Sequence, residues 1–127
     1  MCYDILQIFR ALLIILYLCT TVDHTIMTER YNAFLNRIGS DIAKDRIYTD
    51  ELRRFAWGTD AGFYRMTPQI VIRSASEEEV SSILKAASEL NVPITFRAAG
   101  TSLSGQAVSD SVLVVAGKNW ERIHTAR

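Results

Sequence analysis

The sequence has few of the residues that build metal sites and disulfide frameworks, and no excess charge of either sign. Its 127 residues include two cysteines and two histidines, and 14 basic residues balance 14 acidic ones. Two cysteines, Cys2 and Cys19, exclude a disulfide framework, a cysteine zinc site and a cysteine-ligated iron–sulfur cluster within this chain. A net charge of zero is not typical of an electrostatic nucleic-acid binder. We therefore expect neither a metal nor a nucleic-acid partner.

Long apolar runs are also scarce, and the one at Ile5–Cys19 is the most apolar part of the chain. Its uncharged part after Arg10 is shorter than the roughly 20 residues that span a bilayer, and its flanks are unlike those of a signal peptide. Residues 1–26 are thus an extension upstream of a true start at Met27, a weak signal or membrane anchor, or a packed helix. Membrane contact depends on this segment, and we otherwise expect a cytoplasmic location.

Two helices and a loop are predicted in residues 27–67. Helical spacing over residues 28–38 gives one apolar face, formed by Tyr31, Phe34, Leu35 and Ile38. A short helix over residues 50–56 would turn three apolar residues inward, namely Leu52, Phe55 and Ala56. The following residues, 57–68, contain two glycines and end in a proline, so they are predicted to form a loop.

A strand–helix–strand pattern occupies residues 69–97, with strands predicted at 69–73 and 93–97. Ser76 and Glu79 form a capping box at the start of the helix, and Asn91 is a suitable left-handed cap at its end. The expected buried face is Val80, Ile83, Leu84, Ala87 and Leu90. A crossover helix implies parallel strands, and residues 111–116, apolar on both faces, suit a central parallel strand. The predicted fold class is α/β, a small parallel sheet with flanking helices.

The stretch "RAAGTSLSGQAVSD", Arg97–Asp110, follows the carboxyl end of a predicted parallel strand, where open α/β sheets bind ligands. Gly100 and Gly105 can adopt backbone angles closed to other residues, and consecutive amides can form a concave site for an anion. Hydroxyl groups and the Arg97 cation add further donors. These groups suffice to hold a phosphate or pyrophosphate without a metal. The alternative is an ordinary surface connection, since neither a Walker loop nor Gly-x-Gly-x-x-Gly is present.

Residues 67–123 resemble the first flavin-binding half of the FAD-linked oxidases and dehydrogenases, the vanillyl-alcohol oxidase / p-cresol methylhydroxylase (PCMH) superfamily. The resemblance rests on Glu79-Val80, Val92-Pro93, Arg97 and the segment "AGTSLSGQA" at residues 99–107. Within the superfamily, the likeness is greatest to the group of D-lactate dehydrogenase and the glycolate oxidase large subunit. A weaker likeness extends upstream, so that about residues 28–123 are covered.

The resemblance implies that the loop wraps the pyrophosphate of FAD with backbone amides. The implied cofactor-binding residues are Arg97, Ala98, Ala99, Gly100, Thr101, Ser102, Leu103, Ser104, Gly105 and Gln106. No histidine lies between residues 25 and 123, so we expect non-covalent FAD. Residues 68–127 would be the first lobe of a PCMH-type FAD-binding domain, a fold that is α+β in the full family. The second lobe and the substrate domain are expected to lie outside this chain.

The activity implied for the parent protein is oxidation of a 2-hydroxy acid, such as D-lactate or glycolate, by hydride transfer to FAD. We assign no catalytic residue to this chain, because His24 and His124 lie near its ends and suit surface positions. We therefore expect an FAD-binding fragment that is inactive alone, or a subunit whose flavin site a second chain completes. The alternative is a truncated module that binds a nucleotide or a partner chain without turnover.

Overall fold

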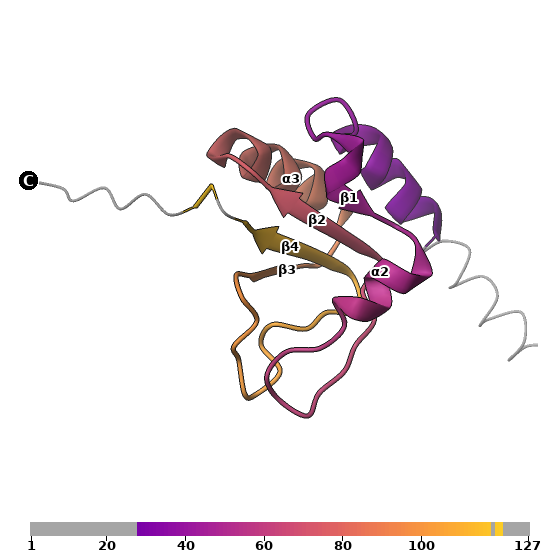
Figure 1. The fold of residues 1–127 in the computed structure, drawn as a ribbon. Helices are drawn as coiled ribbons and strands as arrows, with labels where there is room; N and C mark the ends of the chain where they lie inside the picture. Colours follow the sequence, from indigo (N-terminus) through magenta and orange to yellow (C-terminus); the bar gives the residue numbers. More distant parts are fainter. Residues whose placement is uncertain (1–27, 118, 121–127) are drawn as a thin grey trace, which may run out of the picture.

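The computed structural model describes residues 28–117 and 119–120. A helix over residues 28–38 comes first. The elements that follow along the chain are η1 (Lys44–Arg46), β1 (Ile47–Tyr48), α2 (Glu51–Ala56), β2 (Ile70–Ser74), α3 (Glu77–Leu90), β3 (Ile94–Arg97) and β4 (Val112–Ala116). Figure 1 shows the first helix and α3 on one side of the sheet, with α2 and two long loops on the other. The interpretations of residues 1–26 lie outside the described residues, and the cytoplasmic location stays a prediction.

The four strands form one mixed sheet in the order β1-β2-β4-β3. β4 pairs in parallel with both neighbours, Val112 lying opposite Ile70 of β2 and Ile94 of β3. β1 pairs antiparallel with β2, Ile47 opposite Ile72. The three predicted strands are therefore confirmed as parallel, and the sheet has a fourth, antiparallel strand that was not predicted. A strand of two residues is too short to show the alternation by which strands are recognised in a sequence.

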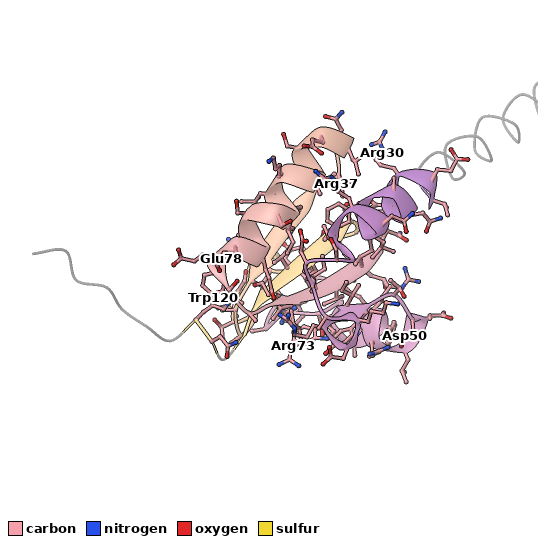
Figure 2. All side chains as sticks on the ribbon, turned by 90° about the horizontal axis from the view of Figure 1, so that it is seen from above. Arg30, Arg37, Asp50, Arg73, Glu78 and Trp120 are labelled. Atoms are coloured by element: carbon pink, nitrogen blue, oxygen red, sulfur yellow. The ribbon has the colours of Figure 1, made fainter. Side chains whose placement is uncertain are left out.

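The main core lies between the sheet and the two helices on its upper side in Figure 1. The predicted face of the first helix is confirmed, since its three innermost residues are buried and Leu35 packs against them. Figure 2 shows Arg30 and Arg37 on this helix, on the side next to α3. Arg30 donates to the carbonyl of Asn91 at 3.2 Å. On the opposite face of the sheet, a smaller apolar cluster consists of Val71, Leu113 and Val115, and Tyr48 and Trp57 pack against it.

Both ends of α3 follow their local sequence signals. The Ser76 hydroxyl accepts a hydrogen bond from the Glu79 amide at 3.3 Å, and Asn91 ends the helix with a left-handed φ of 51°. The Glu79 carboxylate reaches past the cap residue and accepts from the amide of Ala75 at 2.8 Å. The prediction that Leu84 is buried is wrong, because its side chain is 47% exposed. Leu84 is turned about 100° around the axis from the buried Ile83, away from the sheet.

The short helix α2 is confirmed, but the side chains predicted to point inward do not. Asp50 caps its first turn by accepting from the Arg53 amide at 3.1 Å. Leu52 is 78% exposed and Phe55 is 52% exposed, and Ala56 is exposed as well. A helix of six residues turns fewer than two times, and the contact with the sheet is made by the next residue, Trp57.

Within the part of the chain that the structure describes, no helix is long and apolar enough to cross a membrane.

Candidate functional site

The candidate site lies where the three parallel strands end. A cleft of about 390 Å³ is open there, lined by Trp57, Arg73, Ala98, Ala99, Val115, Ala116 and Gly117. These residues come from the last positions of β2 and β4, from the start of the loop after β3, and from the residue after α2. Figure 2 shows Arg73 on the side of the sheet away from α3 and its Glu78. The carboxyl ends of parallel strands are the expected position for a ligand in such a sheet.

Two glycines shape the loop between β3 and β4. Gly100 has φ 73° and Gly105 has φ 77°, so both adopt the left-handed conformation that glycine favours. A Cβ atom at position 100 would lie 1.8 Å from Nη2 of Arg97, which is far inside van der Waals contact. A Cβ atom at position 105 would lie 3.1 Å from the ring of Tyr64. The prediction that these glycines adopt backbone angles closed to other residues is confirmed.

The backbone of the loop presents a series of free hydrogen-bond donors. Among the described residues, no acceptor is found for the amide N–H groups of Gly100, Thr101, Ser102 and Leu103. The sequence between Arg97 and Ser109 contains no acidic side chain that would repel an anion. Successive unpaired amides in such a loop create a positive concave surface. This part of the loop therefore has the donors that a phosphate group needs.

The hydroxyl groups of the loop divide into two kinds. Ser102 Oγ accepts from the amides of Ser104 at 3.4 Å and Gln106 at 3.1 Å, and it donates to the side-chain oxygen of Gln106. Ser102 and Gln106 therefore hold the turn together from within. The exposed hydroxyls of Thr101 and Ser104 make no hydrogen bond to the described part of the chain, so they can contact a ligand.

Arg97 lies beneath the loop, with its guanidinium directed at backbone oxygens. Its donors reach four carbonyls at 2.9–3.5 Å, those of Thr59, Trp57, Ala107 and Ala99. The guanidinium also stacks on the Trp57 ring, 5.2 Å from its centroid. Burial lowers the pKa of Arg97, and the nearby charge of Asp60 opposes this shift. The predicted cation at the edge of the loop is thus mostly engaged by the protein backbone.

A second loop, residues 57–67, contributes to the site and was predicted only as a connection. The amide of Ala61 donates to the carbonyl of Gly100 at 3.0 Å. A Cβ atom at Gly62 would lie 2.9 Å from the Leu103 carbonyl oxygen, so the two loops touch backbone to backbone. Asp60 accepts from the Gly62 amide at 2.8 Å and shapes this approach. The glycine at position 62, two residues after an aspartate, was the available signal that a close contact occurs here.

Parallel strands with a crossover helix and an amide-lined loop at their carboxyl end form an arrangement that α/β proteins use to bind dinucleotides. Residues 68–126 match the family model described as FAD binding domain. The described residues have the fold of a PCMH-type FAD-binding domain, as the resemblance in the sequence implies.

Similar proteins extend well beyond this chain. A D-lactate dehydrogenase from Archaeoglobus fulgidus is 49% identical over 39 residues, which cover 31% of this chain and 9% of that protein. The crystal structure of p-cresol methylhydroxylase with substrate bound has a TM-score of 0.62 at 13% identity, covering 76% of this chain and 20% of that one. Alkyldihydroxyacetonephosphate synthase has a TM-score of 0.60 at 17% identity, covering 74% and 21%. At these identities the structural likeness shows the fold, and the chain spans about a fifth of either solved structure.

The residues of the loop fit the phosphate part of FAD. The unpaired amides of residues 100–103 are donors, Gly100 at their start has no side chain, and the segment contains no carboxylate. The cleft beside the loop adds an apolar wall at Trp57 and Val115 and a cation at Arg73. A dinucleotide-binding site needs hydrogen-bond donors for the phosphates and an adjoining cleft for the rings.

Proposed function

We propose that this chain binds FAD non-covalently through the loop that follows Arg97, residues 98–106, as the first lobe of a flavin-dependent oxidoreductase. The proposal rests on one observation above all: four successive unpaired amides, those of residues 100–103, begin at the left-handed Gly100 just after the carboxyl end of β3. The match of residues 68–126 to an FAD binding domain supports the same cofactor. The short identity with a D-lactate dehydrogenase supports a 2-hydroxy acid, such as D-lactate or glycolate, as the substrate of the parent enzyme.

The described residues have a binding role in this proposal. FAD, when bound, supplies the hydride acceptor. The amides of Gly100 to Leu103 would hold the pyrophosphate, with Thr101 and Ser104 hydroxyls as further donors, while Ser102 keeps the turn in shape. The described part of the chain contains no histidine that could act as base or attach the flavin. We therefore propose that a second chain, or a continuation of the parent protein, completes the flavin site and supplies the catalytic groups.

The test is a titration of the 127-residue chain with FAD, ADP and riboflavin, followed by flavin fluorescence and by calorimetry. If the loop holds the pyrophosphate, FAD and ADP bind competitively and riboflavin, which lacks phosphate, does not bind. After acid precipitation the flavin should remain in the supernatant, because no covalent bond holds it. Equal binding of FAD and riboflavin, or no binding of FAD and ADP, would contradict the proposal.

A pair of threonine variants tests the loop itself. Thr101→Val removes the free hydroxyl at constant shape and should weaken FAD binding by roughly three- to tenfold, the usual worth of one hydrogen bond. Thr49→Val is the matched control, since Thr49 is an exposed threonine before α2 and outside the loop. Equal affinities in all three proteins would remove Thr101 from the site.

A further inference from the structure

We propose that Arg97 is a positioning residue, which aims the amides of the loop by holding its carbonyls, and that it does not contact the ligand. The part of this inference that concerns FAD binding rests on the proposed function. The loop segment concerned is residues 98–107, and the second segment that Arg97 holds is residues 57–59.

The hydrogen bonds of Arg97 tie together segments that are distant in the sequence. One guanidinium nitrogen, Nη1, donates to Trp57 at 3.2 Å, to Thr59 at 2.9 Å and to Ala107 at 3.3 Å, each time at a backbone carbonyl. The other, Nη2, donates to Ala99 at 3.5 Å. Nε is buried, so no ligand can reach it. The guanidinium holds two nitrogens in one rigid plane, so it reaches the Ala99 carbonyl together with the other three, whereas a lysine has a single nitrogen on a flexible stem.

Anchored carbonyls determine where the adjacent amides point. In a trans peptide the C=O and the following N–H point in opposite directions, and the described residues contain no cis peptide. Because the Ala99 carbonyl is directed at Arg97, the Gly100 N–H must point away from the guanidinium. The Gly100 carbonyl is held by the Ala61 amide, so the Thr101 N–H points away from the second loop. The unpaired N–H groups of Gly100 and Thr101 therefore point away from Arg97 and Ala61, which hold the adjacent carbonyls.

Gly100 and Arg97 are sterically matched. The guanidinium lies against the Cα of Gly100, where a Cβ atom would come within 1.8 Å of Nη2 and 2.4 Å of Cζ. Any larger residue at position 100 must displace Arg97 in addition to adopting a left-handed conformation. The second left-handed glycine, Gly105, contacts Tyr64 and not Arg97, which makes it a matched control with nearly the same φ.

A double-mutant cycle on the 127-residue chain tests this match without any ligand. Gly100→Ala and Gly105→Ala are each made in the wild type and in Arg97→Met, whose flexible side chain can move aside. The penalty of Gly100→Ala on the unfolding equilibrium constant should be about tenfold smaller in Arg97→Met than in the wild type. The penalty of Gly105→Ala should agree between the two backgrounds within about twofold, as expected for independent sites. Equal penalties of Gly100→Ala in both backgrounds would overturn the inference.

Affinity for FAD separates positioning from direct contact. If Arg97 positions the loop, Arg97→Lys and Arg97→Met weaken binding to the same extent and leave the salt dependence of the Kd unchanged. If Arg97 contacts a phosphate, Arg97→Lys retains most of the affinity and Arg97→Met flattens the salt dependence; this result would overturn the inference. A wild type that does not bind FAD contradicts the proposed function alone, and the unfolding cycle then decides whether Arg97 positions the loop. If Arg97→Met does not fold, Arg97→Lys takes its place as the background in the unfolding cycle.

Discussion

Replacement of Glu79 by glutamine should destabilise the protein at neutral pH, because this carboxylate joins α3 to the antiparallel edge of the sheet. It accepts two hydrogen bonds from the Arg46 guanidinium, at 2.7 and 2.6 Å, and one from the Ala75 amide at 2.8 Å. Arg46 also donates to the carbonyl of Arg73, at 3.1 Å. The pair therefore connects η1, the end of β2 and the first turn of α3.

The magnitude follows from the burial and geometry of the pair. The side chains of Arg46 and Glu79 are 24% and 14% exposed, whereas those of the Arg37–Glu89 pair are 58% and 51% exposed. Exposed ion pairs contribute about 0–1 kcal/mol, and a hydrogen bond to a charged group contributes about 1.5–3 kcal/mol. A glutamine keeps the size and one acceptor oxygen of Glu79. We therefore expect Glu79→Gln to lower the free energy of unfolding by about 2 kcal/mol, and Glu89→Gln by less than about 0.5 kcal/mol.

The effect should depend on pH in one direction. The hydrogen bonds from Arg46 hold the pKa of Glu79 below its ordinary value of 4.5. A lowered pKa means that the unfolded chain takes up the proton first, so the stabilisation is complete above about pH 4.5. It is lost as the pH falls through the pKa of the folded state. The difference between wild type and Glu79→Gln should therefore shrink in acid.

The assay is urea unfolding followed by circular dichroism, at neutral pH and at several values below about pH 5. Glu89→Gln is measured alongside as the exposed control. A Glu79→Gln variant within about 0.5 kcal/mol of the wild type at neutral pH would refute the reasoning. A difference that persists unchanged in acid would show that the loss is one of packing and not of charge.

Unfolding measurements also check three further predictions. Ile83→Ala should cost about 3 kcal/mol because Ile83 is fully buried, whereas Leu84→Ala should cost less than about 1 kcal/mol. Tyr31→Phe should cost about 1 kcal/mol, since it removes the buried hydrogen bond from the tyrosine hydroxyl to Ser111 Oγ at 2.8 Å. Asn91→Ala should cost about 1 kcal/mol and Asn91→Gly little or nothing, because the residue has a φ of 51°; equal costs would show that the left-handed cap is not the reason for asparagine here.

Local signals explain which parts of the fold the sequence predicts. Ser76 and Asn91 act on backbone groups within a few residues, and both ends of α3 are where these residues predict them. The strands β2 and β4 are apolar and mostly buried on both faces, so they are also predicted. β1 has two residues and no period, and its pairing with β2 depends on a contact across the chain. The exposure of Leu52 likewise follows from how a very short helix meets the sheet.

The candidate site divides in the same way. The glycine conformations at positions 100 and 105 follow from residue type, and the absence of acidic side chains can be read directly. The position of Arg97 could not be predicted, because its carbonyl acceptors at Trp57 and Thr59 lie about 40 residues earlier in the chain. Backbone acceptors leave no mark in a sequence, so an arginine near a phosphate-binding loop is naturally interpreted as a ligand contact.

The site therefore extends beyond the segment that carries the family pattern. The FAD binding domain model matches residues 68–126. The direction of the loop amides, however, depends on contacts with earlier residues. The carbonyls of Trp57 and Thr59 accept from the Arg97 guanidinium, and the Ala61 amide donates to the Gly100 carbonyl. Changes at Thr59 or Ala61 can thus alter the loop without replacing a residue that lines the cleft or the loop. The geometry of the loop consequently depends on contacts that come from outside the loop.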